Sequence, residues 1–199
     1  MSTPIGYFEQ MYATSRDPWS FESRWYDARK HALTADVLPR RRYRSGFEPG
    51  CSTGMLTSRL AARCDRLLAV DAIEAAVRAA AERVADQPHV TVRAARMPRD
   101  WPDDTYDLIV LSELAYYFDD ADLAELLDRV AGSLERGGDL VAVHWRHRVA
   151  EHARSGDEVH AQLAALLGLH RMARHEETDF LLEVFTSDPR SIAQREGLV

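Results

Sequence analysis

Five short apolar segments alternate with helical patterns from residue 43 onward, and this alternation constrains the fold more than any other feature. The apolar segments are Arg44–Glu48, Arg66–Asp71, His89–Ala95, Tyr106–Ser112 and Asp139–Trp145. The helical patterns lie between them, at Gly54–Ala62, Ile73–Val84 and Asp120–Leu134. Strands that alternate with helices form a parallel sheet with helices on both faces. We therefore expect a doubly wound α/β core over residues 43–187.

The end of the chain departs from this alternation. A helix is expected near Gly156–Leu167, followed by two strands at 169–176 and Phe180–Thr186. The few residues between these strands cannot make a parallel crossover, which needs about a dozen residues or more. The two strands should therefore form an antiparallel hairpin at the edge of the sheet.

Residues 1–42 precede the core and are rich in aromatic side chains. They hold seven of the seventeen aromatic residues of the chain: Tyr7, Phe8, Tyr12, Trp19, Phe21, Trp25 and Tyr26. Asp17-Pro18 predicts a turn, and Phe21–Leu38 predicts a helix that Pro39 ends. These aromatics either pack helices onto the core or cover a ligand site as a lid, and both can hold at once. We expect one domain over residues 1–199, with 1–42 as its helical lid.

Composition argues against several classes of protein. The chain has 25 Lys and Arg against 32 Asp and Glu, and a net charge of −7 disfavours a general nucleic-acid binder. Its two cysteines, Cys51 and Cys64, cannot form a disulfide framework or a four-thiolate zinc site. No apolar run approaches the roughly 18 residues of a membrane span, and the first residues do not resemble a signal peptide. We expect a cytoplasmic monomer or homodimer that acts on a small molecule, with no membrane partner.

A glycine loop after the first core strand is the main functional motif. Residues 47–54 read Phe-Glu-Pro-Gly-Cys-Ser-Thr-Gly, and glycines there allow a tight turn and close approach to a ligand. The dinucleotide fingerprint G-x-G-x-x-G would need glycine where Ser52 and Met55 stand. An acid followed by G-x-G-x-G fits Glu48, Gly50 and Gly54, and departs only at Ser52. The second spacing is therefore the better match.

An acidic residue follows the loop at a suitable distance. Asp71 ends the second strand, 17 residues after Gly54, about where a carboxylate meets the hydroxyls of a ribose. The alternative is that Asp71 only caps the next helix. Two further motifs are the strand Tyr106–Ser112 and the turn at Gly137-Gly138 that leads into the fifth strand.

Together these motifs resemble the class I S-adenosylmethionine-dependent methyltransferases over residues 44–186. A narrower resemblance, to the NodS-like methyltransferases, runs over nearly the whole chain. It rests on Tyr7-Phe8, Asp17-Pro18-Trp19, Trp25-Tyr26, Arg29-Lys30, residues 47–52, Leu111-Ser112-Glu113, Tyr116-Tyr117, His144-Trp145-Arg146-His147 and residues 156–160. The chain departs from the general methyltransferase pattern at Ser52, which replaces a glycine, and at Arg136, where proline is common.

The resemblance implies a Rossmann-like class I methyltransferase fold and S-adenosyl-L-methionine as the cofactor. It also implies methyl transfer to a small-molecule acceptor, most simply the nitrogen of an amine or amino sugar. The prototype of the NodS-like proteins N-methylates a chitooligosaccharide signal, but family membership does not transfer that acceptor.

The cofactor is expected at the carboxyl ends of the strands, near the switch in strand order. Its expected contacts are Trp19, Tyr26, Arg29, Lys30, Glu48, Gly50, Cys51, Ser52, Gly54, Asp71, Ala72, Arg96, Met97 and Ser112. Arg29 and Lys30 are candidates to hold its carboxylate, or they form a solvated helix face. Trp19 and Tyr26 would pack over the cofactor, because an aromatic face attracts a sulfonium. Arg96 and Met97 would flank the adenine, although Met97 could equally belong to the core.

The acceptor side is expected around His144, Glu113 and Tyr116. An amine acceptor must arrive unprotonated, and a neutral histidine suits that task because its pKa lies near neutrality. His144 is therefore a candidate base or acceptor-positioning group, and a structural histidine bonded to a loop carbonyl is the alternative. A metal site at His144, His147 and His152 is disfavoured because their spacing matches no strong helical metal motif.

Three other functions stay open on the residues alone. The nearest is an O-methyltransferase for a sugar or phenolic hydroxyl. An NAD-dependent oxidoreductase is disfavoured by Met55 and by the terminal hairpin. A non-catalytic module that keeps the cofactor pocket is the third, and a methyl-transfer assay separates it from an enzyme.

Overall fold

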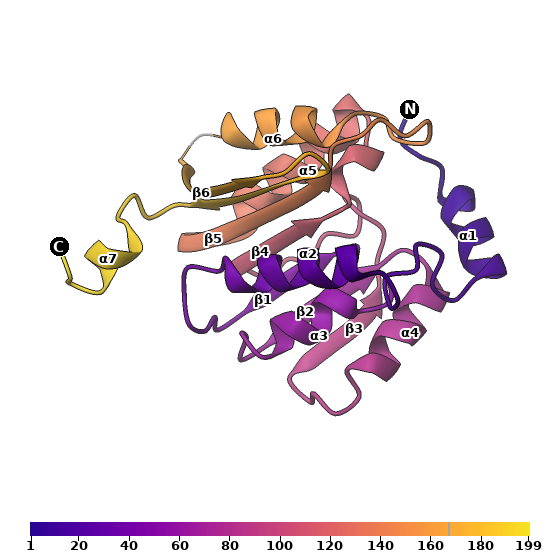
Figure 1. Cartoon of the computed structure of the whole chain (residues 1–199), viewed down its shortest axis with the longest axis horizontal. Helices are drawn as coiled ribbons and strands as arrows, with labels where there is room; N and C mark the ends of the chain where they lie inside the picture. The colour runs from indigo at the N-terminus through magenta and orange to yellow at the C-terminus, as the bar shows by residue number, and fades with distance from the viewer. Residues whose placement is uncertain (167) are drawn as a thin grey trace.

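A computed structural model confirms the α/β core and describes residues 1–166 and 168–199 (Figure 1). One seven-stranded sheet has the strand order β3-β2-β1-β4-β5-β7-β6. The strands are β1 Gly46–Pro49, β2 Leu67–Asp71, β3 Val90–Ala94, β4 Tyr106–Ser112, β5 Leu134–Trp145, β6 His170–Glu176 and β7 Phe180–Thr186. Strands β1 to β5 are parallel, and β7 is antiparallel to both of its neighbours.

Helices cover both faces of this sheet (Figure 1). They are α1 Ile5–Thr14, α2 Trp25–Asp36, α3 Met55–Ala61, α4 Glu74–Arg83, the short 3-10 helix η1 Ala115–Tyr117, α5 Asp120–Ser133, α6 Gly156–Ala164 and α7 Ile192–Arg195. Helices α2, α3 and α4 pack on one face, and α5 and α6 pack on the other. Helix α1 lies against the start of α4 through Tyr12, Ile73 and Ala76.

The central strand β4 shows how the helices on both faces are held to the sheet. Leu108 and Val110 point to the face covered by α3, whereas Ile109 and Leu111 point to the face covered by α5. All four side chains are fully buried. A strand buried on both faces has a continuous apolar sequence, as this one does.

The strand order reverses between β1 and β4, and this reversal positions the site. The connections that leave these two strands run to opposite sides of the sheet, which leaves a crevice at their carboxyl ends. The glycine loop follows β1, and Glu113 follows β4. The two motifs therefore lie on either side of the crevice.

The predicted terminal hairpin is confirmed, and the structure refines its place. Strand β6 forms the edge of the sheet, while β7 lies inside it between β5 and β6. The helix expected at Gly156–Leu167 ends at Ala164, and Leu167 lies outside the described residues.

Two predicted element boundaries are wrong by four residues or more. The helix expected from Phe21 begins only at Trp25, because the Asp17 carboxylate accepts the backbone N–H groups of Phe21 and Glu22 in a turn, at 3.0 and 2.9 Å. Strand β5 begins at Leu134, not at residue 139, because Leu134 already pairs with Tyr106 of β4. The two glycines expected to form a turn lie within this strand.

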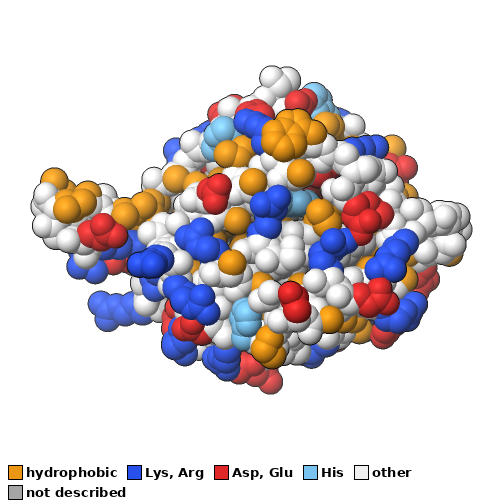
Figure 2. All heavy atoms as spheres, turned by 60° about the horizontal axis from the view of Figure 1, so that its bottom comes forward, with side chains coloured by type: hydrophobic (Ala, Val, Ile, Leu, Met, Phe, Trp, Pro, Cys, Tyr) orange, Lys and Arg blue, Asp and Glu red, His pale blue; other side chains and the backbone are white. Residues whose placement is uncertain are grey.

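The surface shows no single dominant charge on the face seen in Figure 2. Lys and Arg side chains are interspersed there with Asp and Glu side chains, and the C-terminal segment with α7 projects from the body. In the part of the chain that the structure describes, no helix is both long enough and apolar enough to cross a bilayer.

The packing of α5 leads to a prediction about stability. Leu126 is fully buried against the sheet, whereas Asp128 on the same helix is exposed. Leu126→Ala should lower the free energy of unfolding by about 2–5 kcal/mol, because it removes buried methyl groups and leaves a cavity. Asp128→Ala should change it by less than about 0.5 kcal/mol. Urea unfolding measures both, and equal effects would mean that α5 does not pack as described.

Candidate functional site

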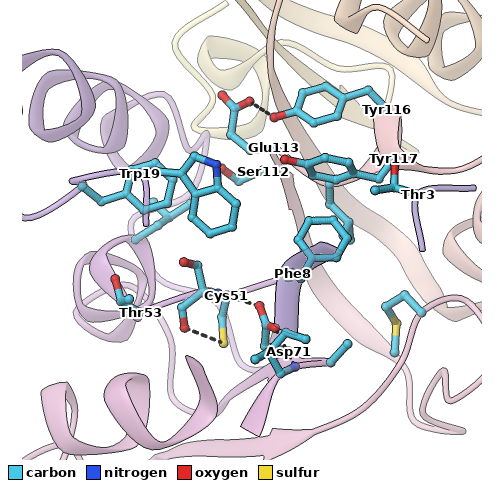
Figure 3. Close-up of a pocket in the computed structure, with 18 of the residues that line it drawn as sticks. Thr3, Phe8, Trp19, Cys51, Thr53, Asp71, Ser112, Glu113, Tyr116 and Tyr117 are labelled. Carbon is cyan, nitrogen blue, oxygen red and sulfur yellow. Dashed lines mark hydrogen bonds between the residues drawn. The ribbon is translucent and has the colours of Figure 1, made fainter. Parts of the chain in front are cut away.

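A cavity of about 410 Å³ opens at the carboxyl ends of the parallel strands (Figure 3). Residues at or just after the carboxyl ends of five strands line it: Gly50–Thr53 at β1, Asp71–Ile73 at β2, Ala95–Met97 at β3, Ser112–Leu114 at β4, and Trp145 at β5. Side chains of the N-terminal segment close it from the other side, among them Phe8, Trp19 and Lys30. The volume falls within the range of small-molecule sites, about 300–1,000 Å³.

The glycine loop takes the sharp turn that its sequence predicts. Gly50, Ser52 and Gly54 have φ angles of 77°, 51° and 78°, all in the left-handed region. A Cβ at Gly54 would come within 2.9 Å of the Cα of Ala80 on α4, so only glycine fits there. Ser52 adopts the backbone conformation expected of a glycine, and its hydroxyl lies 2.7 Å from the hydroxyl of Tyr12. This contact joins α1 to the loop.

Asp71 lines the cavity and also orders the loop. Its two carboxylate oxygens accept the N–H groups of Ser52 and Ile73, each at 2.9 Å. Burial raises the pKa of Asp71 above its ordinary value, although these N–H groups oppose the shift. An ionised carboxylate offers about four acceptor positions, so capacity for further donors remains. The capping role and a ligand-binding role are therefore compatible.

Several buried polar atoms of residues that line the cavity have no hydrogen-bond partner within the described protein. They are Tyr26 Oη, His31 Nδ1, Glu48 Oε2 and Thr53 Oγ1. Burial raises the pKa of Glu48 to about 8 and lowers the pKa of His31 to about 4. Burying a polar group without a partner costs about 1–3 kcal/mol. A polar ligand in this cavity could supply the missing partners.

A buried ionic network forms the other side of the cavity. The Lys30 ammonium lies 2.7 Å from Glu113 Oε1 and 3.3 Å from Asp27 Oδ1. The second oxygen of Glu113 accepts the Tyr116 hydroxyl and, at 3.0 Å, the N–H of Trp145. Burial is the largest single influence and would raise the pKa of Glu113, but Lys30, His144 and the hydrogen bond from Tyr116 together outweigh it, and the pKa falls to about 2. One ammonium between two carboxylates leaves a net negative charge here.

Figure 3 shows how the two sides face each other. Glu113 and Tyr116 lie on one side of the pocket, with Tyr117 and Phe8 next to them, and Asp71 lies on the opposite side. Most of the residues predicted from the sequence line the cavity: Trp19, Tyr26, Lys30, Glu48, Gly50, Cys51, Ser52, Asp71, Ala72, Arg96, Met97, Ser112, Glu113 and Tyr116. Gly54, Arg29 and His144 do not.

Arg29 is directed away from the cavity, unlike its neighbour Lys30. Its guanidinium makes two hydrogen bonds to the Glu177 carboxylate in the terminal hairpin, at 2.9 and 2.7 Å. It therefore joins α2 to the hairpin, and it does not lie where it would meet a ligand carboxylate.

The sequence predicts His144 on the acceptor side of the cavity, but in the structure His144 does not line the cavity. It is fully buried, and its Nε2 accepts the N–H of Ala115 at 3.2 Å. Burial lowers the pKa of His144 to about 3. The ring has no free lone pair with which to take a proton from an acceptor, so this geometry argues against the role of base.

The other two histidines of the disfavoured metal site, His147 and His152, contact other side chains. His147 lies 2.7 Å from Asp179, and the ring of His152 stacks on Tyr116 with 3.9 Å between centroids. Over residues 1–166 and 168–199, no three His, Cys, Asp or Glu side chains are placed to hold a metal ion.

Sequence reasoning missed several residues of the cavity. Asp27 lies one helical turn before Lys30 on α2, at i,i+3, and one turn before His31, at i,i+4. That spacing is a signal that would have identified Asp27 once Lys30 was considered, and then His31 from Asp27. Tyr12 and Tyr117 had no comparable signal, because their positions depend on how α1 and η1 pack.

The sequence is similar to a family of nodulation proteins. The model of the family described as Nodulation protein S (NodS) matches residues 9–166. Nodulation protein S from Rhizobium tropici is 27% identical over 127 residues, which are 63% of this chain and 53% of that protein. The Azorhizobium caulinodans protein of the same name is 30% identical over 122 residues, or 61% and 56% of the two chains. The chain thus spans about half the length of the curated relatives it matches.

Solved structures agree with these matches. N-methyltransferase NodS from Bradyrhizobium japonicum WM9, in complex with S-adenosyl-L-homocysteine, is 26% identical, covers 93% of this chain and 98% of that chain, and has a TM-score of 0.83. A Pseudomonas syringae protein provisionally assigned as a methyltransferase is 47% identical, covers 82% and 99%, and has a TM-score of 0.73. The predicted class I methyltransferase fold is confirmed. Because the family match covers most of the sequence, the chain belongs to the Nodulation protein S (NodS) family.

Proposed function

We propose that the protein is an S-adenosyl-L-methionine-dependent methyltransferase that acts on the nitrogen of a small amine or amino sugar. One observation carries the proposal: a single cavity has the glycine loop and Asp71 on one side and the Lys30–Glu113 network on the other. The first side suits an adenosyl cofactor, and the second suits a cationic acceptor. Membership of the NodS family and the S-adenosyl-L-homocysteine bound by a NodS protein support the same function.

The residues of the cavity fit this cofactor. Asp71 keeps acceptor capacity for two ribose hydroxyls, and Met97 offers an apolar side chain beside an adenine ring. The amino-acid part of the cofactor carries a carboxylate and an ammonium. The unpartnered hydroxyls of Tyr26 and Thr53 can donate to the carboxylate, and the unpartnered oxygen of Glu48 can accept from the ammonium. The orphaned atoms therefore match the ligand in chemical type.

The acceptor would be held by the network around Glu113. When bound, the cofactor supplies an electrophilic methyl group on its sulfonium. The negative charge left by Asp27 and Glu113 around Lys30 attracts a cationic amine. The amine loses its proton to solvent before it is enclosed, and its free lone pair then attacks the methyl carbon. The Tyr116 and Trp145 rings line the cavity and exclude water from the acceptor nitrogen. Orientation of this kind can account for most of the rate of a displacement reaction.

The first test is the methyl-transfer reaction itself. Labelled S-adenosyl-L-methionine is incubated with the protein and a panel of primary amines, amino sugars and matched hydroxyl compounds. We expect label on nitrogen, because the acceptor side is anionic. Label on oxygen alone would replace the proposal with an O-methyltransferase, and cofactor binding without transfer to any acceptor would indicate a binding module.

Asp71 provides a test of the cofactor side. Asp71→Asn should weaken binding of S-adenosyl-L-homocysteine by about 1–3 kcal/mol, because a charged acceptor for the ribose hydroxyls is lost. Isothermal titration calorimetry measures the affinity, and Asp86→Asn on the exposed surface serves as the control. An unchanged affinity in a folded Asp71→Asn protein would leave Asp71 with its capping role alone.

The N-terminal segment provides a test of the proposed lid. Tyr12, Trp19, Tyr26 and Lys30 all line the cavity, so a bound cofactor would lie beneath them. Hydrogen exchange of residues 19–30 should slow when S-adenosyl-L-homocysteine is added, because a lid closes over its ligand. Exchange of α5 serves as the internal reference. Equal exchange of residues 19–30 with and without ligand would mean that these aromatics only pack the helices onto the core.

A further inference from the structure

A chain of buried polar side chains lies behind the cavity, and the proposed reaction does not use it. His144 Nδ1 lies 3.2 Å from His160 Nε2, and His160 Nδ1 lies 2.7 Å from Glu183 Oε2. All three side chains are at most 2% exposed. The chain runs from β7 through α6 to β5, and it ends where His144 Nε2 accepts the N–H of Ala115.

Gly156 makes this arrangement possible. A Cβ at that position would lie 2.4 Å from the carbonyl oxygen of Trp145 and 2.9 Å from the Cβ of His144. Glycine therefore lets the first turn of α6 approach β5 closely. His160 follows four residues later, on the same face of the helix, and so meets His144.

The contacts fix the proton positions along the chain. The N–H of Ala115 can only donate, so His144 Nε2 is unprotonated and its Nδ1 carries the proton. His144 Nδ1 must then donate to His160 Nε2, which is therefore unprotonated. His160 Nδ1 carries the second proton and donates to the Glu183 carboxylate. Each acceptor fixes the tautomer of the next ring, and both rings are neutral.

Glu183 is held as the ionised end of the chain. Arg171 lies 3.0 Å from its other oxygen, and Arg174 lies 3.5 Å from the same atom. Burial would raise the pKa of Glu183, but His160 and Arg171 hold it below its ordinary value. An ionised carboxylate only accepts hydrogen bonds, so His160 Nδ1 must donate to Glu183. This requirement agrees with the donors and acceptors assigned to the bonds between His160, His144 and Ala115.

The segment at the other end carries the acceptor side of the cavity. Glu113, Tyr116 and Tyr117 all line the cavity. Glu113 has a φ of 53°, a conformation that persists in a non-glycine residue only when its surroundings enforce it. The Tyr116 ring also packs edge-on against the ring of His144, with 5.3 Å between centroids.

We propose that Glu183, His160 and His144 form a positioning relay that holds residues 113–117, and with them Glu113 and Tyr116, in place for the acceptor. The effect on turnover rests on the proposed function, whereas the hydrogen-bonded chain itself does not. In this account His144 is a positioning residue and not a base.

The environment of His144 keeps its ring in one tautomer over the physiological range of pH. The titratable groups that face it are Glu113 after β4, Lys30 on α2, His152 in the loop after β5, and His160 on α6. Burial is the strongest influence on its pKa, which lies at about 3. Protonation of Nε2 would also place two donors opposite each other at Ala115. The tautomer should therefore not change between pH 5 and pH 8.

Nuclear magnetic resonance tests the chain directly in the wild-type protein. A hydrogen bond of the N–H···N type transmits a scalar coupling between the two nitrogens. We expect one coupling between the Ala115 amide nitrogen and His144 Nε2, and another between His144 Nδ1 and His160 Nε2. The ¹⁵N shifts at neutral pH should report both rings as the Nδ1–H tautomer, and His144 should keep this tautomer from pH 5 to pH 8. A proton on Nε2 of either ring at neutral pH, or titration of His144 in this range, would overturn the relay.

Two substitutions at His144 separate positioning from simple packing. His144→Gln keeps an acceptor at the place of Nε2, whereas His144→Leu removes it. His144→Leu should speed amide exchange of Ala115 and lower kcat by about 10- to 100-fold, because a small misplacement of reacting groups has effects of that size. Affinity for S-adenosyl-L-homocysteine should stay within about twofold, since the glycine loop and Asp71 are untouched. His144→Gln should recover most of kcat, and His170→Leu on exposed β6 is the control.

The outcomes distinguish this proposal from the proposed function. Equal losses of kcat in His144→Gln and His144→Leu would overturn the positioning role. A wild-type protein that shows both couplings but transfers no methyl group would overturn the proposed function and leave the chain intact. If His144→Leu does not fold, the couplings in the wild-type protein and the recovery in His144→Gln still decide the matter.

Discussion

The buried ammonium of Lys30 is the contact on which the site depends. Burying a charge of this kind costs several kcal/mol unless partners compensate it closely. Lys30 is 3% exposed, and its partners are Asp27 on its own helix and Glu113 at the end of β4. The pairing therefore fixes α2 across the carboxyl ends of the strands. A segment that lies outside the α/β core thereby becomes one wall of its cavity.

The same contact links the two halves of the site. Glu113 receives Lys30 from one side and Tyr116 and Trp145 from the other, so all of its contacts lie within the protein. Its pKa of about 2 means that it stays ionised and is a poor base. The acceptor side thus contributes negative charge and orients the acceptor. The unpartnered atoms of the cavity belong instead to the residues that fit the cofactor. The buried chain that ends at Ala115 supports this division, because it orders the backbone that carries Glu113.

Much of this could be predicted from the sequence, for reasons that differ between elements. Strand β4 was predicted with its observed bounds because a fully buried strand is a continuous apolar run. The loop at Gly50 and the acid at Asp71 were found because close backbone approach restricts residue type at fixed spacing. The start of β5 at Leu134 was missed, since it depends on pairing with Tyr106 and not on local preference. The neighbours Arg29 and Lys30 looked equivalent, and only the packing of α2 separates them. The burial of His144 behind the cavity could not be predicted, because its partners, His160 and Glu183, are distant in sequence.

A crystal structure of the protein with S-adenosyl-L-homocysteine is the most direct measurement of the central claim. We expect the ligand in the cavity between the glycine loop and Glu113, with both ribose hydroxyls bonded to Asp71. The amino-acid part should reach the unpartnered atoms of Tyr26, Glu48 and Thr53, and the sulfur should face the side of Tyr116. A ligand bound outside this cavity, or a ribose that leaves Asp71 with only its bonds to Ser52 and Ile73, would contradict this claim.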